Sequence, residues 1–235
     1  MEASSYGPGA VPGPGPGREA DVAPAPAAPA GGLLGWVPAD PASLGLAGFA
    51  MPTFILGLVN ANAISKGDVY IVLALTAYGG LIQLLAGMWA FAERNTFAAT
   101  AFSSYGAFWI SFVLLEQFFA PEGIKASSAT AFNHGVAVYL LAWGFFTFYM
   151  WIASFRVSIA VNLVFIFLAA AFVILGIGLL GSGHPTITKI GGWVTVATAC
   201  LAWYTSFAIV LNRTMDRTLL PVFPLTRPIS GPGAP

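Results

Sequence analysis

Six long runs of apolar residues, separated by short polar stretches, occupy the middle of the chain. Each run is close to the ~20 residues with which an α-helix crosses the hydrocarbon core of a bilayer. The runs are apolar on all sides and lack the two-residue alternation of barrel strands. The pattern predicts an all-α integral membrane protein with six transmembrane helices, whose transmembrane domain spans residues 40–221. The predicted spans are 44–63, 69–92, 97–120, 133–155, 157–180 and 190–211.

The two ends of the chain differ in composition from the middle. Residues 1–39 and 222–235 are rich in proline and glycine, as in Gly13-Pro14-Gly15-Pro16-Gly17. Such segments bury too little apolar surface to offset the entropy lost on ordering. We therefore expect a disordered tail at each end.

Basic residues divide unevenly between the two sides of the predicted spans. All the arginines fall on one side and all the lysines on the other. The arginines are Arg18, Arg94, Arg156, Arg213, Arg217 and Arg227, and the lysines are Lys66, Lys125 and Lys189. Cytoplasmic loops carry the excess of basic residues, so both termini are predicted to be cytoplasmic in a multi-pass protein of the plasma membrane.

Composition and motifs argue against several classes of protein. Charged residues make up 8% of the chain, against about 25% in soluble domains, and the net charge is zero. Nucleic-acid binding needs a basic surface, which this chain lacks. The single cysteine, Cys200, forms neither an internal disulfide nor a metal cage. Metal and phosphate motifs such as HExxH and GxxxxGK are absent, so we expect no enzyme, no metal and no cofactor.

Uncharged polar residues inside the apolar runs are candidates for lining a path through the membrane. Hydroxyls and amides can hydrogen-bond a small solute, but a bare carboxylate would cross at higher cost than its protonated acid. The candidates are Thr53, Asn60, Gln83, Ser103 and Ser104. Glu116 is the one acid within the runs. Its place near the end of the third run favours snorkelling to water, and a role at the mouth of a pore is the alternative.

Several short motifs follow one another in a set order. The first motif is Asp40-Pro41-Ala42-Ser43-Leu44-Gly45-Leu46. It resembles the signature Asn-Pro-Ala-Pro-Leu-Gly-Leu of the acetate uptake transporter family. The two agree at positions that include Pro41, Leu44 and Gly45, whereas the family has asparagine in place of Asp40. The longest match is Thr100-Ala101-Phe102-Ser103-Ser104-Tyr105-Gly106-Ala107-Phe108-Trp109. With later motifs such as Gly191-Gly192-Trp193, the resemblance covers about residues 40–221.

The resemblance implies a homohexamer in which each six-helix protomer contains its own pore. It also implies a narrow apolar gate, for which the matching residues are Phe49, Tyr105 and Leu168. Besides Asp40, the chain departs from the family pattern at Ala90 and Ile209, where many relatives carry glutamate.

Three functions are compatible with the sequence. The leading hypothesis is a channel or proton-linked carrier for acetate and similar small monocarboxylates. The uncharged path and the missing acids favour a second, a pathway for a small neutral solute such as ammonia. The third is a membrane receptor or assembly protein that transports nothing, and the short loops leave little soluble surface for its partners.

Overall fold

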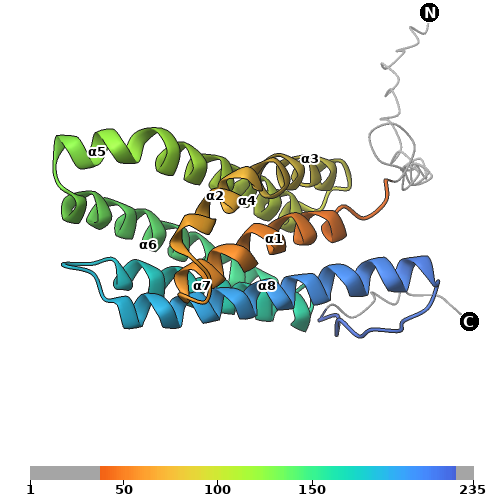
Figure 1. Cartoon of the computed structure of the whole chain (residues 1–235). Coiled ribbons are helices and arrows are strands. Elements are labelled where there is room, and N and C mark those ends of the chain that lie inside the picture. The colour runs from red at the N-terminus through yellow and green to blue at the C-terminus, as the bar shows by residue number, and fades with distance from the viewer. Residues whose placement is uncertain (1–37, 226–235) are drawn as a thin grey trace, which may run out of the picture.

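The computed structural model describes residues 38–225, which form an elongated bundle of helices (Figure 1). The predicted disorder of residues 1–37 and 226–235 lies outside the described residues. The elements, in chain order, are α1 (Ala42–Asn60), η1 (Lys66–Asp68), α2 (Val69–Ala74), η2 (Ala77–Ile82), α3 (Gln83–Ala92), α4 (Thr96–Leu114), η3 (Leu115–Phe119), α5 (Ala120–Ala126), α6 (Ala129–Ser154), α7 (Ile159–Gly178) and α8 (Pro185–Thr214).

Six spans account for the described part of the chain. Five are unbroken helices that are long and apolar enough to cross a membrane, and α4, η3 and α5 together form one of them, Thr96–Ala126. The remaining span is a bent pair, Lys66–Ala74 and Ala77–Ala92, with an angle of 43° between its halves. Between residues 38 and 225 there is no β-strand, only an isolated bridge between Ser158 and Pro224. The predicted all-α, six-span fold is confirmed.

Short polar residues set where three of the spans begin. The side chains of Asn95, Ser128 and Ser158 each accept a hydrogen bond from the backbone N–H three residues further on, at 3.0, 3.1 and 3.2 Å. The first N–H groups of a helix have no partner within the helix, and such caps satisfy them. Polar residues between apolar runs therefore fix the starts of α4, α6 and α7.

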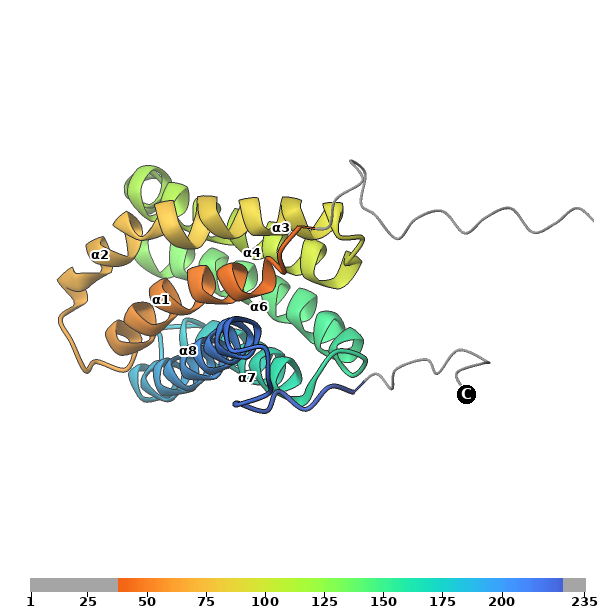
Figure 2. The same cartoon turned by 90° about the vertical axis from the view of Figure 1, so that its right-hand side faces the viewer.

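Helix α1 lies at the centre of the bundle (Figure 2). It packs extensively on α8, and it also contacts η2 and α3. On one side of α1, helix α8 packs against α7, and α7 packs against α6. On the other side, α3 packs against α4. Helices α4 and α6 contact each other much less. The cavities described below lie instead between α1, α4 and α7, which contribute residues to the walls of all three.

Small residues allow the closest helix contacts. At Gly106 in α4, an added Cβ would lie 2.7 Å from the backbone oxygen of Gly80 and 2.7 Å from the backbone nitrogen of Leu84. Because those neighbours are backbone atoms, they cannot rotate away from a larger side chain. Glycine at this position therefore sets the distance between α4 and the η2–α3 segment.

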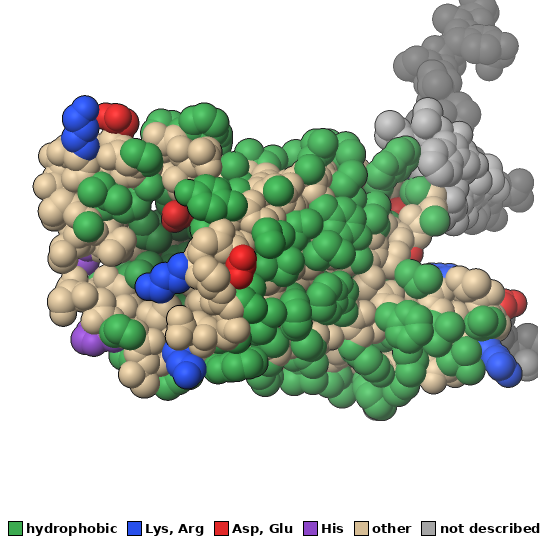
Figure 3. All heavy atoms as spheres, in the orientation of Figure 1, with side chains coloured by type: hydrophobic (Ala, Val, Ile, Leu, Met, Phe, Trp, Pro, Cys, Tyr) green, Lys and Arg blue, Asp and Glu red, His purple; other side chains and the backbone are tan. Residues whose placement is uncertain are grey.

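The exterior is consistent with a membrane environment. Figure 3 shows a broad hydrophobic band over the middle of the bundle, with charged side chains at its two ends. Large apolar side chains such as Tyr70, Phe118 and Phe145 are more than 60% exposed. The two ends of the described chain lie at the same end of the bundle, as an even number of spans requires (Figure 1).

The C-terminal segment differs from the expected tail. The N–H groups of Ile159 and Ala160 donate to the carbonyls of Phe223 and Val222, and Leu225 N–H donates to Val157 O. The hydroxyl of Tyr204 also holds Pro221 O at 2.8 Å. Residues 222–225 are therefore docked at the start of α7, and the predicted tail boundary at 222 was too early.

Candidate functional site

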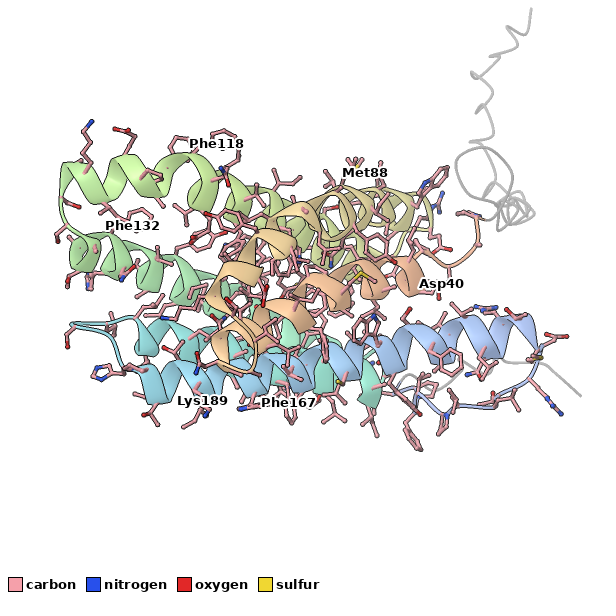
Figure 4. The ribbon with its side chains drawn as sticks, in the orientation of Figure 1. Asp40, Met88, Phe118, Phe132, Phe167 and Lys189 are labelled. Carbon is pink, nitrogen blue, oxygen red and sulfur yellow. The ribbon has the colours of Figure 1, made fainter. Side chains whose placement is uncertain are left out.

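Three cavities lie in series between the helices. The Glu116 cavity, about 320 Å³, is lined by residues of α1, α4–α5, α6, α7 and α8. The narrow cavity has about 20 Å³, room for about one water molecule. The Asp40 cavity, about 240 Å³, is at the other end. Figure 4 shows the labelled Asp40 and Lys189 at opposite ends of the bundle.

Shared walls establish the order of the cavities. Phe49 and Leu168 line both the Glu116 cavity and the narrow cavity. Leu46 and Phe165 line both the narrow cavity and the Asp40 cavity. The narrow cavity is therefore the constricted middle of a line that runs from one end of the bundle toward the other.

The three residues predicted to form a gate come together at this constriction. Phe49 on α1, Tyr105 on α4 and Leu168 on α7 all line the narrow cavity. Each is at most 5% exposed, and the ring centroids of Phe49 and Tyr105 are 5.9 Å apart. Three helices distant in sequence thus contribute one apolar side chain or ring each to a single layer.

The hydroxyl of Tyr105 is engaged within the protein. It lies 2.9 Å from Thr147 Oγ1 on α6, and the Thr147 hydroxyl donates its own proton to Trp143 O at 2.7 Å. Because a threonine hydroxyl has one proton, Tyr105 is the donor in the bond between the two hydroxyls. The tyrosine proton is therefore occupied, and only an acceptor lone pair of this oxygen is left.

Gln83 supplies the other polar group of the narrow cavity. Its side chain is 1% exposed, and its Oε1 atom has no hydrogen-bond partner among the described residues. A buried amide oxygen without a donor is costly, and a small polar molecule that donates a hydrogen bond to it relieves that cost. Gln83 is the first residue of α3, directly after the π-helical segment η2.

The five predicted path residues divide into two groups. Thr53 and Asn60 line the Glu116 cavity, and Gln83 lines the narrow cavity. Ser103 and Ser104 line none of these three cavities, and Ser103 instead packs against Gly87 of α3. In a helix, positions 103 and 104 point about 200° and 100° away from Tyr105. They therefore face other neighbours.

The signature residues hold the start of α1. Asp40 Oδ1 accepts a hydrogen bond from Ala42 N at 2.8 Å, as a helix-capping carboxylate does. A Cβ on Gly45 would meet the Phe102 ring at 2.6 Å, so glycine lets that ring pack on α1. Pro41 is buried at the start of the helix, and Leu44 is 44% exposed. Asp40 also lines the Asp40 cavity.

Acidic charge gathers near the Asp40 cavity. Burial raises the pKa of the Glu93 carboxyl above its ordinary value, and the negative charge of Asp40 raises it further, while Arg213 lowers it. Ile209, one of the departures from the family pattern, lines this cavity, and Ala90, the other, is fully buried in the core. Both positions therefore present apolar side chains.

Sequence reasoning missed two parts of the cavity walls. Val222 and Pro224 of the docked C-terminal segment line the Asp40 cavity. The apolar residues in Pro221-Val222-Phe223-Pro224-Leu225 were the available signal for this docking. In the Glu116 cavity, Phe108, Trp109 and Phe172 form much of the wall. No sequence signal separates such aromatics from ordinary packing residues.

Known proteins resemble this chain along most of its length. Acetate permease A of Emericella nidulans is 38% identical over 198 residues, which cover 78% of this chain and 65% of the permease. The succinate-acetate/proton symporter SatP of Escherichia coli K12 is 34% identical, with 78% of this chain and 95% of the symporter covered. Ammonia transport outward protein 2 of Saccharomyces cerevisiae is 37% identical over 179 residues. The chain spans less than two thirds of the length of the fungal proteins.

A solved structure and a family model agree with these relatives. The structure of the bacterial acetate channel SatP matches with a TM-score of 0.71 and 34% identity, over 79% of this chain and 99% of that channel. The model of the GPR1/FUN34/yaaH family matches residues 37–227, which contain all three cavities. The resemblance inferred from the sequence motifs is confirmed, and the chain belongs to the GPR1/FUN34/yaaH family.

Proposed function

We propose that this protein carries acetate and similar small monocarboxylates across the cell membrane, along the line of the three cavities in each protomer. The observation that carries the proposal is the narrow cavity, where Phe49, Tyr105 and Leu168 meet between two larger cavities. The names of the relatives, an acetate permease and a succinate-acetate/proton symporter, support the choice of solute.

The constriction selects by size and by charge. An anion that enters it loses hydration and gains no countercharge, because the residues lining the narrow cavity are all uncharged. A protonated acid loses less, and its O–H group can donate to the free Gln83 Oε1. The proposed gate therefore passes a small carboxylic acid more readily than its bare anion.

A small neutral solute such as ammonia is the second candidate. The uncharged lining of the narrow cavity favours it, as do the apolar side chains at Ala90 and Ile209. The yeast relative named as an ammonia transport outward protein supports it as well. The unpartnered Gln83 Oε1 would also accept a hydrogen bond from ammonia.

Flux measurements distinguish the two candidates. The full-length protein is reconstituted into sealed vesicles, and uptake of labelled acetate is compared with the alkalinisation caused by ammonia. We expect acetate uptake well above that of protein-free vesicles and ammonia entry at the protein-free rate. The opposite result would make ammonia, and not acetate, the transported solute. If neither solute crosses faster than in protein-free vesicles, a receptor or assembly role is favoured.

We propose that six protomers assemble around a common axis, with one path per protomer. The large exposed apolar side chains of the spans can contact either lipid or a neighbouring protomer. Native mass spectrometry of the same detergent-purified preparation is expected to give six copies of the 24.5 kDa chain. A mass of one or two copies would exclude the hexamer.

We propose further that both termini face the cytoplasm, because the loops at their end of the bundle carry the arginines. In a variant without Cys200, single cysteines at positions 18 and 227 should react with an impermeant thiol reagent only from the cytoplasmic side. A cysteine that replaces Lys66 should react only from outside. Labelling of Lys66→Cys from the cytoplasmic side would show that the orientation is the reverse of the one proposed.

A further inference from the structure

Glu116 is the only charged side chain among the described residues that line the Glu116 cavity. The other polar groups of the wall are amides and hydroxyls, together with the indole N–H of Trp109, which has no hydrogen-bond partner among the described residues. The amides and hydroxyls belong to Thr53, Asn60, Asn133, Tyr139, Thr188 and Thr195. In the described part of the chain, no residue forms a hydrogen bond or an ion pair with the Glu116 carboxyl. The surface in Figure 3 is hollowed at the end of the bundle that carries α5, and side-chain atoms of an acidic residue, drawn in red, lie at this hollow.

A local change of helix geometry keeps Glu116 directed at the cavity. Phe112, Glu116, Ala120 and Ile124 all line it, at steps of four residues. In a regular α-helix each such step turns the side chain about 40° too far, or about 120° over three steps. The π-helical segment η3, Leu115–Phe119, has wider turns and takes back part of this rotation. The acid therefore stays in line with the aromatic wall.

The neighbouring elements offer the Glu116 carboxyl no permanent countercharge. The other titratable group lining the cavity is Tyr139 on α6, whose hydroxyl is held by Ser111 at 2.7 Å. On the elements packed around this end, the charged or titratable residues are exposed or half-buried and do not line the cavity. They are Lys66 and Asp68 on η1, Tyr70 on α2, Glu122 and Lys125 on α5, His134 on α6, His184 before α8 and Lys189 on α8.

We propose that Glu116 is a specificity-determining residue of this cavity, which binds a proton together with the monocarboxylate. When Glu116 is ionised, its charge repels a carboxylate anion in the partly enclosed cavity. When it is protonated, its O–H group donates to the carboxylate, and the two carboxyl groups share one proton. The proposal rests on the proposed monocarboxylate transport and adds the residue through which external pH acts on it.

The test is the pH profile of acetate uptake into vesicles, after subtraction of uptake into protein-free vesicles. Glu116→Gln keeps the size of the side chain but removes the charge and the titration. We expect this variant to take up acetate about tenfold faster than wild type at pH 7.5, and to approach the wild-type rate at pH 5. Glu116→Asp should retain the wild-type pH dependence.

Two further variants complete the design. Glu122→Gln alters an exposed acid on α5 outside the cavity and should leave the profile unchanged. Asn133→Lys adds a positive charge at an exposed position of the cavity wall, and it should also raise uptake at pH 7.5. Asn133→Lys provides the test of cavity charge if Glu116→Gln fails to assemble.

The outcomes separate this inference from the proposed function. Acetate uptake with an unchanged pH profile in Glu116→Gln, and with no gain in Asn133→Lys, would overturn the role of Glu116 alone. Methylammonium uptake that is observed with wild type and lost in Glu116→Gln, while acetate uptake is unaffected, would overturn the role of Glu116 in favour of a cation site. Wild-type uptake no faster than protein-free vesicles would overturn the proposed function and this inference with it.

Discussion

Replacing Leu168 with alanine is expected to let larger acids through, so that lactate uptake relative to acetate uptake rises about tenfold. Leu168 lines the narrow cavity and also the Glu116 cavity, so its side chain closes the passage between them. Alanine removes three carbon atoms from a constriction that now holds about 20 Å³. Lactate and acetate uptake would be measured in the same vesicles and expressed per folded oligomer.

Loss of packing must be separated from widening of the gate. A buried Leu→Ala substitution destabilises a core by about 2–5 kcal/mol, whatever the function of the site. Leu201→Ala deletes the same atoms from a partly buried leucine that lines none of the three cavities, and it should leave the lactate-to-acetate ratio unchanged. An unchanged ratio in well-assembled Leu168→Ala would show that the gate assignment is wrong.

Tyr105→Phe offers a contrasting substitution in the same layer. It keeps the ring that contacts Phe49 but removes the hydrogen bond to Thr147. The width of the constriction should stay the same, so lactate should remain excluded while the rate for acetate changes. Removal of volume and removal of a polar group are thereby distinguished at one site.

Gly106→Val is expected to destabilise the fold by about 3 kcal/mol or more, which corresponds to a fall in melting temperature of about 10 °C. The added side chain would overlap backbone atoms of Gly80 and Leu84, which cannot move without separating α4 from α3. The melting temperature in detergent, with the yield of oligomer from size-exclusion chromatography, measures the effect.

Gly135→Val is the matched control. Gly135 is also a helical glycine in a span, but an added Cβ there meets no atom within 4 Å. We expect its melting temperature to stay within about 2 °C of wild type. Equal losses in both variants would mean that the β-branched side chain, and not the helix contact, is responsible.

The sequence predicted the spans better than it predicted the faces of the helices. Run length alone identifies six spans, because the thickness of the bilayer sets that length. The motif residues Phe49 and Tyr105 do meet, with Leu168, at the narrow cavity. Ser103 and Ser104 line none of the three cavities. The sequence could not show this, because a run that is apolar all round has no periodicity to indicate which side faces inward.

Local backbone geometry was also beyond sequence reasoning. The second span is bent by 43°, and the third contains the π-helical segment Leu115–Phe119 and continues to Ala126. No proline lies at the bend of the second span, and Pro121 in the third span follows the π-helical segment without showing its position or extent. The orientation of Glu116 depends on the π-helical segment. From the sequence, a role for Glu116 at the mouth of a pore was therefore only the alternative to snorkelling.

The single narrow layer between two larger cavities has an electrical consequence. If solvent fills both cavities, most of the membrane potential falls across the layer of Phe49, Tyr105 and Leu168. A full membrane crossing changes the energy of a unit charge by about 2.3 kcal/mol per 100 mV. An anion would meet nearly all of that voltage in one step, whereas a protonated acid or ammonia would meet none. The direction of the membrane potential then favours export of anions from the cytoplasm and leaves neutral forms to follow their concentration gradients.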